Sequence, residues 1–547
     1  MSAESATVTF TRTITAAAGV FAPGHVGELT RFLPFDLVDA VLTETVRVQR
    51  RMRDLPSRVI VYFVVALGMF PRLGYALVWD KLVAGLSELP LPTPTEAGLR
   101  QARRRVGPGP LRALFDIMAG PLARPDTAGV SYRGMRTVAF DGCSSFKTPD
   151  SYVLRGWLGK VRYRQGLAGY PQLMLMALVE TGTRGLIGVR FGPDRAGEGG
   201  ECGYARRLLH LLTPDMLLLM DRGFDSDDLL TEAAATAHLL VRVGDKRRPR
   251  VETTLSDGSY LTHFGDLRIR IIEAGVTTRL ADGTVFSGRY RLATTLTDHR
   301  AHPATELVTL YHERWEIESA FYALRHTLFN GRVLRSSTPT GLQQELWGLL
   351  ILYQAIRAAI TEAAEQHPGA DPDRASFTIA MEHARNQLIN AAGILPDTLD
   401  ATHAGAAATN TLPPRRDRVS QRRVKTPASR YAYPRATDPR PTSSTTVTDR
   451  HYTIISRTHT PPPTPRPGSL TDLTLTYLHT TAGQPCSAQD IATRTGITTR
   501  QAHFRLAKMV KNGQLIRTAP GYFSLAPPQP EPSHSSPTRV LTPRHET

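Results

Sequence analysis

The sequence is poor in cysteine, and this limits the chemistry available to it. Its three cysteines, Cys143, Cys202 and Cys486, lie far apart and show neither metal-ligand nor redox spacing. They argue against a disulfide framework and against a cysteine-based metal site. A chain with so few cysteines is typical of a reducing compartment, so we expect an intracellular, cytoplasmic protein.

Long apolar runs are also absent. The longest, VIVYFVVALGMF at residues 59–70, is too short to span a bilayer and predicts a buried helix. The first twenty residues lack a basic segment followed by a continuous apolar core, so no signal peptide is predicted. We therefore expect no membrane partner.

Acidic residues are fewer than basic ones. The 547-residue chain has 49 Asp and Glu against 66 Lys and Arg, a formal charge of +17. This excess favours a polyanionic partner, with nucleic acid ahead of a membrane surface. The composition is otherwise globular, and the length suggests roughly three or four domains.

The first two-thirds of the chain change character near residue 134. Residues 20–125 carry apolar residues at helical spacing and predict a helical N-terminal domain. Residues 134–395 predict an α/β domain, with strands and helices in the order βββαβαβ up to residue 243. A β-rich insertion is expected at about 244–300, and helices follow from about 304.

The last third begins with a basic, proline-rich stretch. Residues 401–468 hold twelve basic residues against three aspartates and predict a disordered linker. Order is expected to return at 469–525, and residues 526–547, rich in proline and serine, predict a disordered tail.

One predicted helix, YHERWEIESAFYALRHTL at 311–328, carries an unusual polar stripe. At roughly 100° per residue, Tyr311, Arg314, Glu318 and Arg325 fall within a sector of about 60° beside an apolar face. A carboxylate and two guanidiniums at the edge of a buried face can share one site. A salt-bridged stripe bordering the core is the plain alternative.

Two aspartates follow predicted strands. Asp141 comes after RTVAF and before glycine, and Asp221 comes after DMLLLM and before Arg-Gly. Reactive groups of parallel or mixed sheets gather at the carboxyl ends of strands, although an aspartate that merely opens a turn looks similar. Together with Glu318, these carboxylates predict a site for two hard cations, Mg²⁺ or Mn²⁺, suited to phosphoryl transfer.

These motifs resemble a known family. The pattern Tyr311-x-x-Arg314-x-x-x-Glu318 with a basic residue at 325 resembles the Y-R-E-K signature of the insertion-element-4 transposases. AFDGCSSFKTPDS resembles the segment around their first aspartate, LLLMDRGF the segment around their second, and the N-terminal helices their N-terminal domain. The resemblance covers roughly residues 20–395 and implies a ribonuclease-H-like catalytic core.

The resemblance assigns roles to individual residues. It implies that Asp141, Asp221 and Glu318 are the catalytic, metal-binding triad. It also implies DNA contacts for Tyr311, Arg314, Arg222 and Arg325. Arg325 replaces the lysine of the signature, which keeps the charge and changes its geometry.

Some family members form a DNA hairpin, with an aromatic residue of the insertion stacking on a flipped base. None of the four tryptophans lies within 244–300, and Phe264, Phe286 and Tyr290 are the aromatic candidates there. The hairpin route therefore stays open. Trp315, beside the stripe, is expected to pack in the core.

Residues 469–525 predict a separate module. SAQDIATRTG has a capping-box pattern, Ser487-x-x-Asp490, and ends at Gly496. The order helix, helix, turn, helix, β-hairpin resembles a winged helix-turn-helix, whose third helix enters the major groove. Arg500, His503 and Arg505, with Thr499, are then candidates for DNA contact, and a protein-contact module is the alternative.

The sequence thus favours a DNA transposase with an α/β ribonuclease-H-like core, a helical N-terminal domain and a C-terminal winged helix. Its expected partner is double-stranded DNA, at the element's terminal repeats and at the target, bound by a dimer. Two alternatives remain: a sequence-specific DNA-binding protein with an inactive core, and a nuclease of the same fold.

Overall fold

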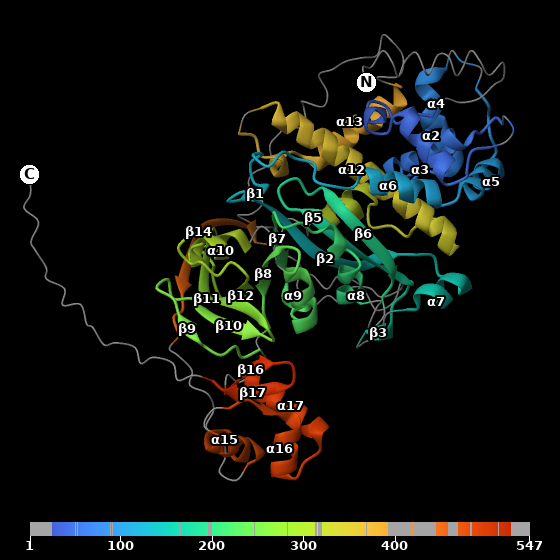
Figure 1. Ribbon diagram of the computed structural model, residues 1–547. Helices are drawn as coiled ribbons and strands as arrows, with labels where there is room; N and C mark the ends of the chain where they lie inside the picture. The colour runs from blue at the N-terminus through green and yellow to red at the C-terminus, as the bar shows by residue number, and fades with distance from the viewer. Residues whose placement is uncertain are drawn as a thin grey trace, which may run out of the picture. The chain divides into compact units, whose positions relative to one another are not determined.

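The structure is a computed structural model (Figure 1). It describes residues 24–391, 418–419, 445–457 and 469–526, apart from short gaps that include 195–199, 312–313 and 315–319. The chain folds into two compact units. The larger holds most of the chain up to Arg457, and the smaller holds the segment from Thr458 onward together with Pro249–Thr253 and Thr262–Leu267.

The N-terminal part of the larger unit is helical, as predicted. After the short helix η1 (Leu29–Phe32), its α-helices are α2 (Phe35–Glu44), α3 (Ser57–Met69), α4 (Tyr75–Val83), α5 (Glu96–Val106) and α6 (Gly109–Met118). Helix α3 is buried at almost every position, which confirms the prediction for residues 59–70. None of the helices among the described residues is long and apolar enough to cross a membrane.

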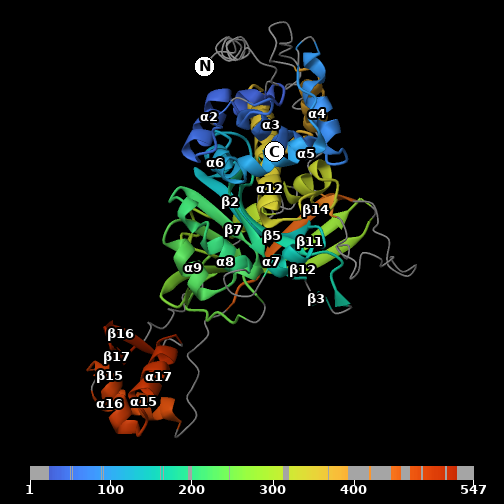
Figure 2. The same cartoon turned by 90° about the vertical axis from the view of Figure 1, so that its right-hand side faces the viewer.

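A 27-residue helix, α12 (Pro339–Glu365), organises the core of the larger unit. It contacts α3 and α6, as well as α13 (Phe377–Ile389). Figure 2 shows α12 beside the N-terminal helices, at one side of the sheet. Side chains from these helices and from the sheet form one continuous hydrophobic core. The N-terminal helices therefore pack against, and stabilise, the core of the unit whose sheet carries the candidate site.

The sheet of the larger unit is mixed. Its main path runs β13-β14-β11-β12-β8-β7-β2-β5-β6. The central strands are β2 (Met135–Lys147), β5 (Gln172–Glu180), β6 (Leu186–Pro193), β7 (Met216–Met220) and β8 (His238–Arg242). Only the β2–β7 and β7–β8 pairs of this path are parallel in the described chain. The short helices α8 (Glu201–Arg206) and α9 (Asp227–Ala234) flank β7 in sequence.

The predicted strand 136–142 is longer in the structure. Asp141 lies within β2, which continues to Lys147, so the expectation that the strand ends at Asp141-Gly142 is wrong. The reason is β5, which pairs with Asp141, Gly142 and Cys143 and satisfies their backbone groups. This pairing overrides the turn preference of the Asp-Gly dipeptide.

The β-rich insertion is present, and it gains a strand from a distant part of the chain. It contains β9 (Thr253–Thr254), β10 (Tyr260–Phe264), β11 (Leu267–Leu280) and β12 (Val285–Thr294). Strand β14 (Thr445–Ile454) pairs antiparallel with β11, and β13 (Arg418–Val419) pairs with β14. Residues 445–454 were predicted to be disordered linker, and for this segment the prediction is wrong.

The backbone around the predicted helix 311–328 is not uniformly α-helical. Helix α10 is described over Ala304–Tyr311, and Ala323–Leu328 form a π-helix, η7. Phe329 N donates to Leu324 O (3.2 Å), a bond spanning five residues. Arg325 lies within this π-helix, so the regular α-helical spacing of about 100° per residue does not apply at its position.

The smaller unit has its own core. It contains α15 (Leu470–Thr480), β15 (Cys486–Ser487), α16 (Ala488–Thr495), α17 (Thr499–Lys511), β16 (Leu515–Ala519) and β17 (Tyr522–Leu525). The predicted capping box of Ser487 and Asp490 is present, and Gly496 ends α16 in the left-handed conformation (φ 70°). Leu478, Ile491, Leu506 and Phe523 belong to its hydrophobic core.

Candidate active site

Asp141 lies in β2, and Asp221 directly follows β7, the neighbouring parallel strand. The last aligned pair of β2 and β7 is Ala139 with Leu219, and Asp141 and Asp221 each come two residues later in the chain. Hydrogen-bonded strands are about 4.8 Å apart. The β7 strand ends at Met220, and Asp221 caps the short helix η5 (Arg222–Phe224) by accepting from Gly223 N (2.7 Å). The two predicted aspartates thus come together at one edge.

Two glycines leave room for carboxylates at this edge. A Cβ on Gly142 would lie 2.8 Å from Oε1 of Glu201, and one on Gly223 would lie 2.9 Å from Oδ1 of Asp221 and 3.5 Å from Oε2 of Glu201. Glu201, the first residue of α8, therefore extends its carboxylate between the segments that carry the two aspartates. It is a third acidic group beside them.

The electrostatics of Glu201 reflect this crowding. Although the residue as a whole is exposed, its carboxylate lies against Gly142 and Gly223. Burial of that end raises the pKa of the Glu201 carboxyl, and the negative charges of Asp221 and Asp194 raise it further. Closely spaced carboxylates of this kind are stabilised by a cation.

Tyr311 supports the edge from the end of α10. Its ring is buried, and its hydroxyl donates to Met220 O (3.1 Å), the carbonyl directly before Asp221. Burial raises the pKa of Tyr311 to about 12, with Arg314 opposing the shift and Asp221 adding to it. The guanidinium carbon of Arg314, also buried, lies 6.0 Å from the centre of the Tyr311 ring. Tyr311 thus fixes the end of β7.

The remaining predicted residues differ in their surroundings. Arg222 is exposed at the start of η5, directly after Asp221. Arg325 is half-exposed on η7. Glu318 and Trp315 lie outside the described residues, so the position of the third predicted triad member stays a prediction.

The insertion contributes an aromatic residue next to Tyr311. The Tyr290 ring meets the Tyr311 ring edge-on at 6.5 Å, and the guanidinium of Arg242 lies 4.7 Å from its centre. Phe264 is buried, and the side chain of Phe286 lies outside the described residues. Tyr290 therefore contacts Tyr311, a residue of the predicted stripe.

The donors at this edge suit a hard divalent cation. They are carboxylate oxygens, the ligands that Mg²⁺ and Mn²⁺ prefer. Within the described part of the chain, no three His, Cys, Asp or Glu side chains already form a metal-ligand set. Burial is the main cause of the raised pKa of Glu201, and a bound cation would offset the further contribution from the charges of Asp221 and Asp194.

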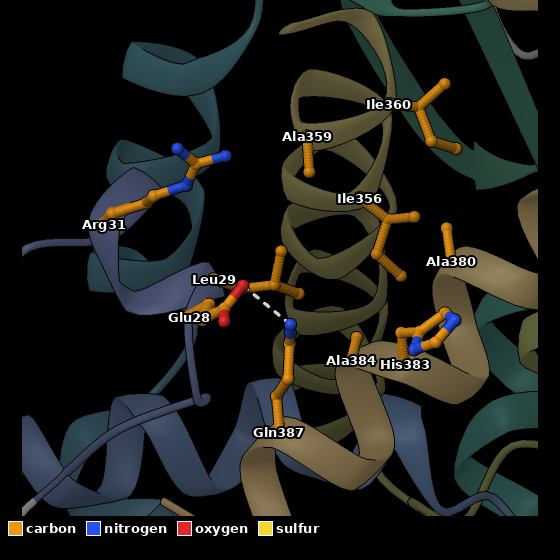
Figure 3. A pocket seen from close by; sticks show the side chains of 10 residues that line it. All are labelled: Glu28, Leu29, Arg31, Ile356, Ala359, Ile360, Ala380, His383, Ala384 and Gln387. Atoms are coloured by element: carbon orange, nitrogen blue, oxygen red, sulfur yellow. Dashed lines mark hydrogen bonds between the residues drawn. The ribbon is translucent and has the colours of Figure 1, made fainter. Parts of the chain in front are cut away.

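A pocket elsewhere in the larger unit is too small to be a substrate site. Figure 3 shows it between η1, α12 and α13, where Gln387 donates to Glu28 (2.6 Å). Its volume is about 30 Å³, the space of roughly one water molecule. The aspartate edge remains the better candidate.

In the smaller unit, α17 presents the predicted DNA-facing residues to solvent. Arg500, His503 and Arg505 are all exposed, whereas Ala502, Leu506 and Met509 face the core. Phe504, on the exposed side, retains 76% of its accessible surface. The helix therefore has one basic, partly aromatic face that its own core does not use.

Comparison with known protein families identifies the chain. Residues 23–116 match the insertion element 4 transposase N-terminal family, and residues 134–355 match the transposase DDE domain family. The two matches occur in the order that the resemblance predicts. The chain belongs to the insertion-element-4 DDE transposases.

Two sequence relatives agree with this membership. The transposase is 26% identical over 407 residues to "Transposase InsG for insertion sequence element IS4" of Escherichia coli (strain K12), covering 72% of this chain and 90% of the relative. It is 28% identical over 205 residues to "Putative transposase InsZ" of the same organism, covering 36% and 64%. A solved piggyBac transposase synaptic complex with hairpin DNA aligns over 69% of this chain and 82% of that chain, at a TM-score of 0.34 and 10% identity.

Sequence reasoning missed Glu201. An acidic residue in the first turn of a helix is common because it complements the helix dipole, so GECGY carries no special signal. Only the closeness of Glu201 to Gly142 and Gly223, which are far from it in sequence, reveals its place. The glycine after each aspartate was the available hint.

Proposed function

We propose that this transposase cleaves DNA at the ends of its insertion element and joins the freed 3′-hydroxyls to target DNA. The observation that carries the proposal is that Asp141 and Asp221 each come two residues after the last aligned pair of the parallel strands β2 and β7, inside the matched DDE domain. Glu318, carried by the segment after α10, is proposed as the third member of the triad.

Asp141, Asp221 and Glu318 would hold two divalent cations, Mg²⁺ or Mn²⁺. When bound, such ions supply Lewis-acid activation of a water or a hydroxyl and stabilise the leaving oxygen of a phosphodiester. The protein's own contribution is to position the two aspartates at the same edge of the sheet. Tyr311 does this through its hydrogen bond to Met220 O.

The basic residues around the edge are proposed to hold the DNA end. Arg222 is exposed directly after Asp221, and Arg325 is half-exposed on η7, so both can reach phosphates. Arg314 and Tyr311 are buried, which favours a positioning role until the DNA end is bound. Tyr311 bonds to the carbonyl directly before Asp221 and Arg314 lies near the Tyr311 ring, which supports a role for both near the scissile phosphate.

The finer fold assignment is part of the same proposal. An antiparallel β6-β5-β2 meander that continues into parallel β7 and β8, with α8 and α9 between, supports a ribonuclease-H-like core. In the smaller unit, three helices and the β16–β17 hairpin support a winged helix-turn-helix. Arg500, His503 and Arg505 would then lie on the DNA-facing side of α17, which enters the major groove.

The proposed DNA partners are the terminal repeats of the element and the target duplex, bound by a dimer. Two ends must be cut and joined, which suggests two active sites acting together. The basic composition of the chain supports extended contact with phosphates.

A cleavage-and-joining reaction tests the proposed function. A labelled duplex with the repeats that flank the gene is incubated with the full-length protein, a supercoiled target plasmid and Mg²⁺. We expect nicks at the repeat boundary and covalent joining to the plasmid. Nicking without joining would indicate a nuclease, and tight binding without nicking would indicate an inactive core; either would overturn the proposal.

A further inference from the structure

The larger unit has a second concave site, formed by three separate segments. A cavity of about 610 Å³ lies between the end of α3 with the following turn, the π-helix η7, and α13. Sites for small ligands have volumes of about 300–1,000 Å³. The cavity is therefore large enough for a ligand and is distinct from the small pocket of Figure 3.

Two rings at this cavity pack against each other in a tilted arrangement and are open to solvent. Tyr322 and His326, one helical turn apart, have ring centres 4.9 Å apart and planes inclined by 34°. Tyr322 keeps 58% of its surface exposed, although its neighbours Phe321 and Ala323 are buried. Much of the Tyr322 ring is therefore not covered by other described residues. An exposed aromatic ring of this kind can stack on a nucleic-acid base.

Cationic side chains surround these rings. Of the described residues that line the cavity, Arg72 and Arg385 are cationic and Glu382 is acidic. Glu382 already pairs with Arg385, whose Nε donates to Met69 O (2.7 Å). Arg72 Nε donates to the Asn330 side-chain oxygen (2.9 Å), in the amide orientation that its neighbours require. Both arginines are thus held in place at the rim.

The positive charge continues toward the active-site segment. Burial lowers the pKa of His326, and the charges of Arg325 and Lys147 lower it further. Arg325 and His326 are consecutive on the π-helix, a conformation that often marks functional sites. After the π-helix, Gly331 N donates a hydrogen bond back to Arg325 O (2.6 Å).

We propose that this cavity receives one nucleotide of the DNA strand that Arg325 holds, with its base stacked on Tyr322 and its phosphate near Arg72. The inference rests on the proposed function, since Arg325 is taken there as a DNA contact. A stacked aromatic ring with flanking guanidiniums suits a base and its phosphate. An apolar peptide would leave the arginines unmatched.

The test compares the affinity of variants for the end duplex, using the full-length protein. We expect Tyr322→Ala to raise the Kd about 5- to 100-fold, the range for one lost base–aromatic stack, and Tyr322→Phe to keep wild-type affinity. Tyr152→Ala, on α7 (Tyr152–Leu158), is the matched control, because Tyr152 is 88% exposed and away from the cavity lining. Thermal unfolding curves establish that each variant is folded.

A second readout locates the base. Single 2-aminopurine substitutions along the duplex are expected to show one position whose fluorescence is quenched in the wild-type complex and recovers in Tyr322→Ala. Equal Kd values for Tyr322→Ala and wild type would overturn the proposal. So would binding of free deoxynucleoside monophosphates that depends on Tyr322 while duplex affinity does not. Wild-type nicking in Mg²⁺, measured in parallel, reports separately on the proposed function.

Discussion

At the scale of single residues, the candidate site depends on glycine as well as on carboxylate. Gly142 and Gly223 follow the two aspartates, and each leaves space that a carboxylate fills. An aspartate followed by glycine is therefore more than a turn signal in this chain. It lets three acidic groups approach one edge of the sheet.

Gly142→Ala tests this packing. The added methyl would lie 2.8 Å from Oε1 of Glu201 and must displace that carboxylate. We expect nicking to fall about tenfold or more, because a small displacement at a reactive centre is costly, while the melting temperature changes little. Gly156→Ala is the control, since a methyl there meets nothing within 4 Å. Unchanged nicking would show that Glu201 does not need this position.

His25 gives the N-terminal helices a defined pH dependence. Its ring is fully buried, with Nε2 2.7 Å from Leu82 O, and burial lowers its pKa from 6.5 to about 4. The fold therefore holds the neutral ring. Its stabilisation is complete above pH 6.5 and is lost as pH falls toward 4, a change on the order of 3 kcal/mol.

The measurement is urea unfolding of wild type and His25→Gln at pH 7 and pH 4.5. Glutamine keeps a donor for Leu82 O and does not titrate. We expect wild type to lose more stability than His25→Gln on acidification. Parallel losses in the two proteins would contradict the account.

At the scale of elements, the sequence correctly predicts those helices, strands and caps that local sequence patterns determine. The buried helix α3, the strands β5 and β7, and the capping box at Ser487 all follow from apolar periodicity or cap chemistry. Three features do not. The length of β2 depends on β5, the order of residues 445–454 depends on β11, and the π-helix η7 breaks a regular α-helical spacing.

Strand β14 shows why composition misleads. Its surroundings are rich in proline and arginine, yet Thr445–Ile454 pairs along β11, with alternation of apolar and polar residues only at its end, in Tyr452-Thr453-Ile454. Beyond it, Arg457 donates to Glu273 (2.7 Å), which also accepts from Arg291 (3.0 Å). A distant partner strand and an ion-pair network supply the order that local composition does not predict.

Two truncations test the role of β14. A chain ending at residue 468 keeps β14 and Arg457, whereas one ending at 440 loses both. Exposing the edge of β11 and leaving Glu273 with fewer cations should lower the melting temperature of the shorter chain by several degrees. Differential scanning calorimetry of the two chains measures this, and equal melting temperatures would show that β14 adds no stability.

At the scale of the whole molecule, basic charge on the C-terminal unit is expected to add DNA affinity. We predict that Arg500→Ala with Arg505→Ala weakens duplex binding and reduces the salt slope of log Kd by roughly 1 to 2, because each lost phosphate contact releases about one fewer counterion. Arg112→Ala, an exposed arginine of α6 paired with Asp116, is the control. Binding curves from low to moderate salt provide the slopes, and an unchanged slope would argue for a protein-contact module.

The central claim is that this transposase cuts DNA with Asp141 and Asp221. The most direct measurement is nicking of the labelled end duplex in Mg²⁺ and in EDTA by wild type, Asp141→Asn, Asp221→Asn and Glu318→Gln. We expect metal-dependent nicks at the repeat boundary for wild type, and a loss of at least about 100-fold in each variant with DNA binding retained. Nicking that survives in Asp141→Asn or Asp221→Asn would contradict the account.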